Sequence, residues 1–137
     1  GEQSFGDWQG STWDEMEARD PETFRKFWET PARSRPPGGE SFADQIARVS
    51  GVIERYTADH TGRDIVAVTH GGTIRAAMAH SLGLTPEGAM SFSISTLSVT
   101  CLEHVQGGLL RGRGGAWRIV RVNAPPHAVT PLVKGGH

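Results

Sequence analysis

The chain has 137 residues, of which 36% are hydrophobic and 21% charged, an ordinary composition for one globular domain that buries its own core. Its formal net charge of −1 gives no broad basic field for nucleic acid or an anionic membrane. The single cysteine, Cys101, excludes an internal disulfide framework, and no apolar run approaches the roughly 20 residues that span a bilayer. We therefore expect a cytoplasmic protein with one domain over residues 1–137.

Two short helices are predicted over residues 11–30. Ser11 or Thr12 can cap the first helix, and Asp20-Pro21 starts the second with proline in its first turn. Three aromatic residues are expected to form the buried stripe of the second helix: Phe24, Phe27 and Trp28. The proline and glycine content of residues 31–39 then predicts a loop.

The clearest helix begins after Ser41, because Ser41-x-x-Asp44 is a capping-box pattern. Apolar residues follow at spacings of four and three, which is the period of a helix with one buried face. They are Phe42, Ile46, Val49, Ile53 and Tyr56. Residues 61–64 end this helix.

A short apolar run with β-branched residues, residues 65–68, leads to His70. Such a run suits a strand buried on both faces of a parallel sheet, so we expect a buried strand over residues 66–69. Gly71-Gly72 breaks the pattern, helical spacing resumes, and Gly83 stops the next helix. We therefore expect His70 at the carboxyl end of the strand, beside a helix N-terminus.

The composition of the last part of the chain predicts strands. Residues 92–105 are rich in serine, threonine and β-branched types and predict one long strand. A glycine-rich loop over residues 107–115 precedes a second strand at residues 117–122. Helix, strand, helix, strand, strand is the order of an α/β sandwich.

His70 is the sharpest candidate for chemistry. Ligands of open α/β sheets bind beyond the carboxyl ends of the strands, and the free N–H groups and dipole of a helix N-terminus favour an anion there. A histidine at that place can add a hydrogen bond or a proton. The alternative is a histidine satisfied by its own turn, with Gly71 and Gly72 serving tight packing. The spacing leaves both interpretations open.

Two further motifs carry no chemistry by their local pattern. Glu2-x-x-Phe5-Gly6-Asp7-Trp8-Gln9-Gly10 is a loop with apolar anchors, and a lone acid near a chain end is usually solvated. Pro37-Gly38-Gly39-Glu40-Ser41 is sufficiently explained as a turn and an N-cap.

Taken in order, these two motifs and Val68-Thr69-His70-Gly71-Gly72-Thr73-Ile74-Arg75 resemble the histidine phosphatase (phosphoglycerate mutase-like) superfamily, in its branch of small bacterial phosphatases. The resemblance runs from Glu2 to about Pro126. It implies a three-layer α/β/α sandwich with a mainly parallel sheet. It also implies that the N-terminal strand of that fold is missing from this chain, so that residues 1–137 form one incomplete domain.

The resemblance assigns roles to three residues. His70 corresponds to the second catalytic histidine, which binds the oxygens of the transferring phosphoryl group. Gly71 would add a backbone N–H to the same oxygens as a substrate-binding residue. Glu2 corresponds to the acid/base that protonates the leaving alcohol and later activates water. The implied function is phosphomonoester hydrolysis through a phosphohistidine, with a small-molecule phosphate ester as partner.

The chain departs from the family at its nucleophile. Family members carry an Arg-His-Gly motif whose histidine becomes phosphorylated, and this sequence contains no such triplet. We therefore expect the 137-residue chain alone to be inactive. A catalytically inactive phosphate- or partner-binding module, and a phosphoglycerate mutase, remain as alternatives. A homodimer is left open, and we expect neither a nucleic-acid nor a membrane partner.

No other residue is expected to substitute for the missing nucleophile. The remaining histidines match no zinc-binding spacing, so neither a metal nor another cofactor is expected. These histidines are His60, His80, His104, His127 and His137. Arg33 and Arg35 are expected in a solvated loop, and Cys101 in the core.

Overall fold

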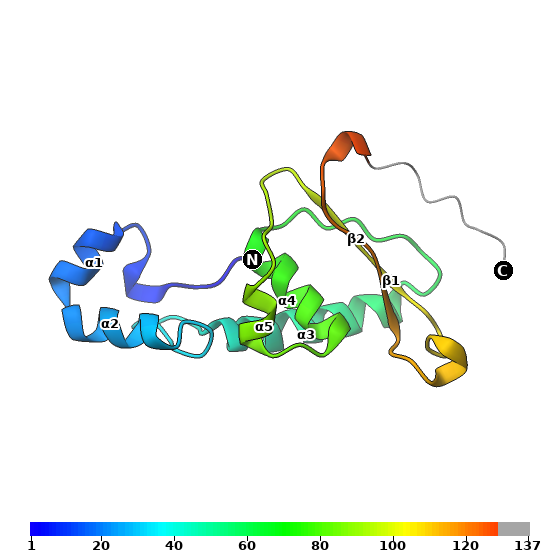
Figure 1. Ribbon diagram of the computed structural model, residues 1–137, viewed down its shortest axis with the longest axis horizontal. Helices are drawn as coiled ribbons and strands as arrows, with labels where there is room; N and C mark the ends of the chain where they lie inside the picture. The colour runs from blue at the N-terminus through cyan, green and yellow to red at the C-terminus, as the bar shows by residue number, and fades with distance from the viewer. Residues whose placement is uncertain (129–137) are drawn as a thin grey trace. The chain divides into compact units, whose positions relative to one another are not determined.

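The computed structural model describes residues 1–128, which fall into two compact units, Gly1–Phe92 and a second unit from Ser93 onward (Figure 1). The helices of the first unit are α1 (Trp13–Arg19), α2 (Pro21–Glu29), α3 (Phe42–Asp59), α4 (Gly71–Leu82) and α5 (Pro86–Met90). The strands of the second unit are β1 (Val99–His104) and β2 (Trp117–Ala124). Short 3₁₀ turns cover Gly6–Trp8, Leu110–Gly112 and Pro126–Ala128. The single domain predicted over residues 1–137 stays a prediction.

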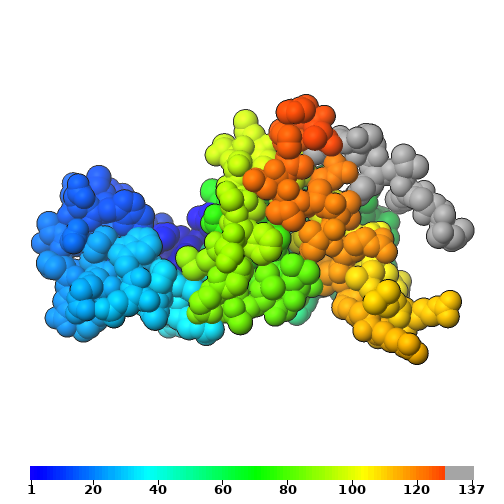
Figure 2. All heavy atoms as spheres, in the orientation of Figure 1, coloured from blue at the N-terminus to red at the C-terminus, as the bar shows by residue number. Residues whose placement is uncertain are grey.

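Helices α1 and α2 begin where the sequence predicts. Thr12 and Glu15 form a reciprocal capping box on α1, and the Asp20 side chain accepts from the Thr23 N–H at the start of α2. The two helices are in contact (Figure 2), and Met16 of α1 and Phe27 of α2 form a small buried cluster with Trp8.

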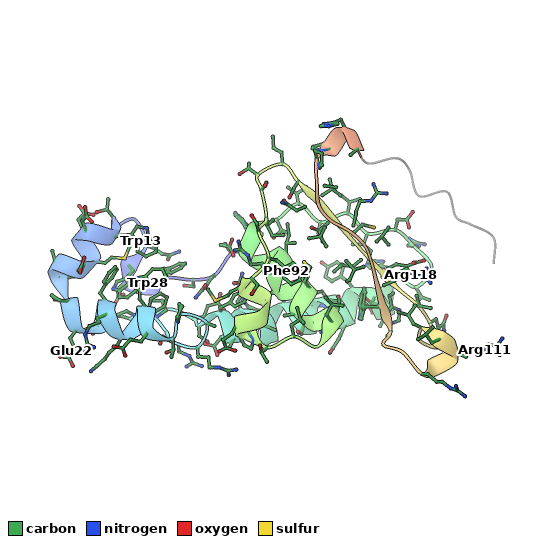
Figure 3. All side chains as sticks on the ribbon, viewed as in Figure 1. Trp13, Glu22, Trp28, Phe92, Arg111 and Arg118 are labelled. Carbon is green, nitrogen blue, oxygen red and sulfur yellow. The ribbon has the colours of Figure 1, made fainter. Side chains whose placement is uncertain are left out.

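The predicted aromatic stripe of α2 is only partly buried. Phe27 is buried and Phe24 half-buried, but Trp28 is 45% exposed. Its ring packs edge-on against that of Trp13, with 5.2 Å between the centroids (Figure 3). Trp13 is itself half exposed, so this pair shields only one side of each ring.

The core of the first unit lies between α3, α4 and α5. The Ser41–Asp44 capping box starts α3 as predicted, and Gly83 ends α4 in the left-handed conformation at φ 64°. Alanines on α4 and α5 let the larger side chains of α3 approach closely. The buried cluster consists of Phe42, Val49, Ala76, Ala79 and Ala89. The short helix α5, capped by Thr85, has no counterpart in the prediction. Among the described residues, no helix is both long and apolar enough to cross a membrane.

The buried strand predicted over residues 66–69 is not formed, and this prediction is wrong. Residues 64–70 carry no regular structure and are exposed, with Val66 90% and Val68 99% accessible. A strand buried on both faces needs neighbouring strands as well as an apolar sequence. Within residues 1–128 the only strands are β1 and β2, which pair with each other. The position of His70 directly before α4 is nevertheless as predicted.

The second unit contains an antiparallel pair. Cys101 faces Arg121 and His104 faces Trp117, with a register irregularity near Cys101. The strand predicted over residues 92–105 is regular only from Val99, and Cys101 is half-buried. Helices with a small sheet agree with the predicted α/β class. The described sheet is antiparallel and two-stranded, so the predicted mainly parallel sheet in a three-layer sandwich is not confirmed.

Candidate functional site

His70 is the N-cap residue of α4. Its backbone is extended, at φ −115° and ψ 164°, and its carbonyl accepts the first helical hydrogen bond, from Ile74 N–H at 3.0 Å. The imidazole makes no capping hydrogen bond to the helix and is exposed. The N–H groups that open α4 are therefore left for another acceptor.

The carboxylate of Glu2 occupies that helix N-terminus. Glu2 Oε2 accepts from Gly72 N–H at 3.0 Å, and Glu2 Oε1 accepts from Gln45 Nε2 at 2.8 Å and from its neighbour Gln3 N–H at 3.0 Å. In Figure 1 the N-terminus of the chain lies beside the start of α4. The engaged donor belongs to Gly72, one residue beyond Gly71, which the sequence predicted as the anion donor. A Cβ atom at residue 72 would overlap the Glu2 carboxylate, so this approach requires glycine.

The segment that carries Glu2 is held from several sides. Thr73 Oγ1 donates to the Gly1 carbonyl at 2.9 Å. Arg48 on α3 donates to the Glu2 carbonyl at 3.4 Å and forms an ion pair with Glu40 at 2.7 Å. Glu40 in turn accepts from Ser4 N–H at 3.0 Å. The Pro-Gly-Gly-Glu-Ser motif, which local pattern explained as a turn, thus anchors the segment that bears the candidate acid.

Electrostatics favour the ionised form of Glu2. Burial raises the pKa of this carboxyl, but the hydrogen bonds from Gln45, Gln3 and Gly72 and the nearby positive charge of His70 outweigh burial and hold the pKa below its ordinary value. Glu40 also has a lowered pKa, chiefly because Arg48 donates to it. An ionised carboxylate at a helix N-terminus is the arrangement that the helix dipole stabilises.

Sequence reasoning missed four members of this arrangement. They are Glu40, Gln45, Arg48 and Thr73. One of them left a signal: Gln45 lies three residues after Phe42 and four before Val49, so it occupies a core position of an apolar helix face. A polar residue there needs a partner. The others are charged or small polar residues of kinds that are usually solvated, and their partners are distant in sequence.

The remaining candidates lie apart from this arrangement. Arg33 pairs with Glu87 and Arg35 with Asp44, both at 2.6 Å, on exposed surface. Within residues 1–128, no three histidine, cysteine or acidic side chains are grouped as they would be to hold a metal ion. His137 lies outside the described residues. The surface hollow along α2, lined among others by Phe24 and Trp28, includes neither Glu2 nor His70.

An exposed imidazole, a carboxylate and a helix N-terminus can together bind an anion and move a proton. The family profile described as "Histidine phosphatase superfamily (branch 1)" matches residues 1–124. This match covers most of the chain, and the chain belongs to the histidine phosphatase superfamily.

Two curated relatives differ in the activity that their names state. A glucosyl-3-phosphoglycerate phosphatase of Mycolicibacterium vanbaalenii is 38% identical over 90 residues, which is 61% of this chain and 40% of the relative. A 2,3-bisphosphoglycerate-dependent phosphoglycerate mutase of Gloeobacter violaceus is 29% identical over 109 residues, which is 78% of this chain and 50% of the relative. The chain thus spans half or less of the length of these relatives.

Among solved structures, YhfR of Bacillus stearothermophilus superposes with a TM-score of 0.73 at 28% identity. The superposition covers 91% of this chain and 58% of that chain. The described residues therefore share the histidine phosphatase fold over the part that both chains contain.

Proposed function

We propose that this chain is part of a phosphomonoester hydrolase that acts through a phosphohistidine intermediate. The observation that carries the proposal is the contact of the Glu2 carboxylate with the N-terminus of α4, directly beside His70. This contact joins two motifs that are 68 residues apart and that the family resemblance assigns to one reaction centre. An acid/base and an anion-binding helix end are thereby brought within reach of a single phosphate ester.

In this mechanism His70 and the first N–H groups of α4 hold the non-bridging oxygens of the phosphoryl group. Donors fixed in advance stabilise the charge that develops during transfer without having to reorganise. The exposed imidazole of His70 is free of helix-capping contacts and can turn toward such a ligand. The phosphorylated histidine itself would come from an Arg-His-Gly motif, which is not in this sequence.

Glu2 must be protonated to donate to the leaving alcohol, although the free site favours the carboxylate. A bound phosphate dianion changes that balance in two ways. Its negative charge disfavours a second negative charge beside it, and its oxygens compete with Glu2 for the Gly72 N–H. Both effects raise the pKa of Glu2 when substrate binds. After the alcohol leaves, the same carboxylate can take a proton from the attacking water.

Two alternative functions are each tied to a specific observation. A phosphate- or partner-binding module without turnover is the alternative if the complete protein lacks an Arg-His-Gly motif, as residues 1–137 do. The phosphoglycerate mutase relative favours a mutase of the same mechanism. The short loop over residues 31–39 leaves little insertion to shield a phosphoenzyme from water, which supports hydrolysis over transfer between sugar-acid hydroxyls.

The test is phosphatase activity of the complete protein on an aryl phosphate, with acid-quenched samples analysed for phosphohistidine. We expect turnover and a phosphorylated histidine outside residues 1–137. Mutase activity with slow hydrolysis would favour the mutase. Phosphate binding without any turnover in a protein that lacks Arg-His-Gly throughout would establish the binding module.

A further inference from the structure

Gln45 is a buried amide on the apolar face of α3. Its side chain is fully inaccessible and lies in line with the buried residues Phe42 and Val49. Its Nε2 group donates to Glu2 Oε1 at 2.8 Å and to Thr73 Oγ1 at 3.3 Å. An amide buried at a core position is costly unless it is hydrogen-bonded, so its partners at the start of α4 explain why it is tolerated there.

The other end of the same amide lacks a partner. Gln45 Oε1 is buried and makes no hydrogen bond within the described part of the chain. It points toward the start of α4, where a Cβ added to Gly72 would lie 3.2 Å from it. Because a side-chain amide presents donors on one side and an acceptor on the other, a half-turn of its terminal torsion exchanges the two.

We propose that Gln45 is a positioning residue that holds Glu2 at the N-terminus of α4 in both protonation states. When Glu2 is ionised, the Gln45 amide group donates to the carboxylate, as in this structure. When Glu2 is protonated, the amide makes a half-turn and its oxygen accepts the carboxylic O–H. The inference rests on the proposed role of Glu2 as acid/base, since a residue that alternates between acid and base needs a support that fits both forms.

The other groups around Glu2 interact with it in different ways. His70 acts on the carboxylate electrostatically, and Arg48 donates to the backbone carbonyl of Glu2 while it pairs with Glu40. The amino group of Gly1 adjoins Glu2 in sequence. The backbone N–H groups of Gln3 and Gly72 donate only. Of the side chains that contact the Glu2 carboxylate among residues 1–128, Gln45 is the one that can both donate and accept.

The experiment is a pH titration of the isotope-labelled complete protein by NMR. It follows the side-chain carboxyl carbon of Glu2 and the two amide protons of Gln45. We expect both sets of signals to move with one midpoint, and we expect the Gln45 signals to stop responding in this range in Glu2→Gln. Gln45 signals that ignore the Glu2 titration, or that still follow it in Glu2→Gln, would overturn the proposal.

Gln45→Met supplies a second test, because methionine keeps the approximate volume and removes the amide. Gln45→Met removes a hydrogen bond from both forms of Glu2, and the Glu2 midpoint should rise because the bond to the ionised form is charge-assisted and is the stronger of the two. Ser41→Ala is the matched control: it removes the cap of the same helix and should leave the midpoint unchanged. An equal shift in both variants, or no shift in a folded Gln45→Met, would contradict the proposal. If Gln45→Met does not fold, the Glu2→Gln titration remains decisive.

Neither measurement requires turnover, so the inference and the proposed function can fail separately. If the complete protein is inactive but its Gln45 and Glu2 signals titrate together, the proposed hydrolase function is refuted and the positioning role of Gln45 is supported. In an active complete protein, Gln45→Met should shift the pH profile of kcat with little change in KM. An active protein whose profile does not shift would refute the positioning role alone.

Discussion

Substituting Gly72 with alanine tests the Glu2 contact with the least disturbance elsewhere. A methyl group at this position would overlap the Glu2 carboxylate and come within 3.2 Å of Gln45 Oε1. The atoms that the methyl group would meet are at the far end of the flexible Glu2 side chain, so we expect the carboxylate to move away while the helix persists. The substitution should therefore separate the role of the contact from the integrity of the fold.

The two contributions to stability oppose each other. Replacing glycine by alanine within a helix stabilises it by roughly 0.5–1 kcal/mol. Losing an anionic group at a helix N-terminus costs about 0.3–1 kcal/mol. The net change in the free energy of unfolding should thus stay within about 1 kcal/mol of zero. In the complete protein, displacing Glu2, which we propose as the general acid, should lower kcat by roughly 10²-fold or more.

The assays are urea unfolding of the 137-residue chain, NMR titration of Glu2, and turnover of an aryl phosphate by the complete protein. Gly51→Ala is the matched control, because Gly51 lies on α3 and an added Cβ meets no atom within 4 Å. It should stabilise the chain and leave Glu2 and turnover unchanged. Near-normal turnover in Gly72→Ala, or a Glu2 midpoint that does not rise, would refute the assigned contact.

Three further predictions follow from the same site. His70→Ala in the complete protein should stay folded and lose roughly 10²–10³-fold in kcat, as removal of a preorganised donor does; near-normal turnover of an aryl phosphate would refute the role. The 137-residue chain alone should show no phosphatase activity, because removing the nucleophile leaves only binding and charge stabilisation; turnover with a phosphorylated His70 would show that His70 is itself the nucleophile. Because the pKa of Glu2 in the folded chain is lowered from its ordinary value of 4.5, its contribution to stability is present above that value and lost as pH falls through the lowered pKa. Urea unfolding from pH 6 to pH 3 should therefore show a smaller loss of stability in Glu2→Gln than in the parent chain, and equal losses would contradict the lowered pKa.

The features that sequence predicted correctly depend on residues close in the chain. Thr12 is one of the two residues predicted to cap α1, Ser41 and Asp44 form the predicted capping box, and Gly83 ends α4 by its own backbone conformation. The position of His70 before a helix follows from the local change of pattern at Gly71. Such contacts are specified by the segment itself, so one sequence suffices to find them.

The features that sequence missed depend on distant partners. The apolar run at residues 65–68 has the composition of a buried strand, but Val66 and Val68 are exposed because no described strand pairs with that segment. Composition indicates which secondary structure a segment can form, but its burial depends on the elements that pack beside it. Gln45 is the converse case, since its partners are 43 residues before and 28 residues after it in the chain.

The role of the Pro-Gly-Gly-Glu-Ser motif is visible only from contacts between residues that are distant in sequence. Glu40 joins Arg48 of α3 to the Ser4 N–H, and Arg48 reaches the carbonyl of Glu2. Ser41 caps the same helix, from which Gln45 donates to the carboxylate. The three motifs are thus connected by contacts within the first unit: one supplies the acid, one holds its backbone, and one offers the helix end that its carboxylate occupies. A change at Glu40 should consequently alter Glu2 before it alters α4, because the contacts of Glu40 reach the backbone of the N-terminal segment and not the helix end.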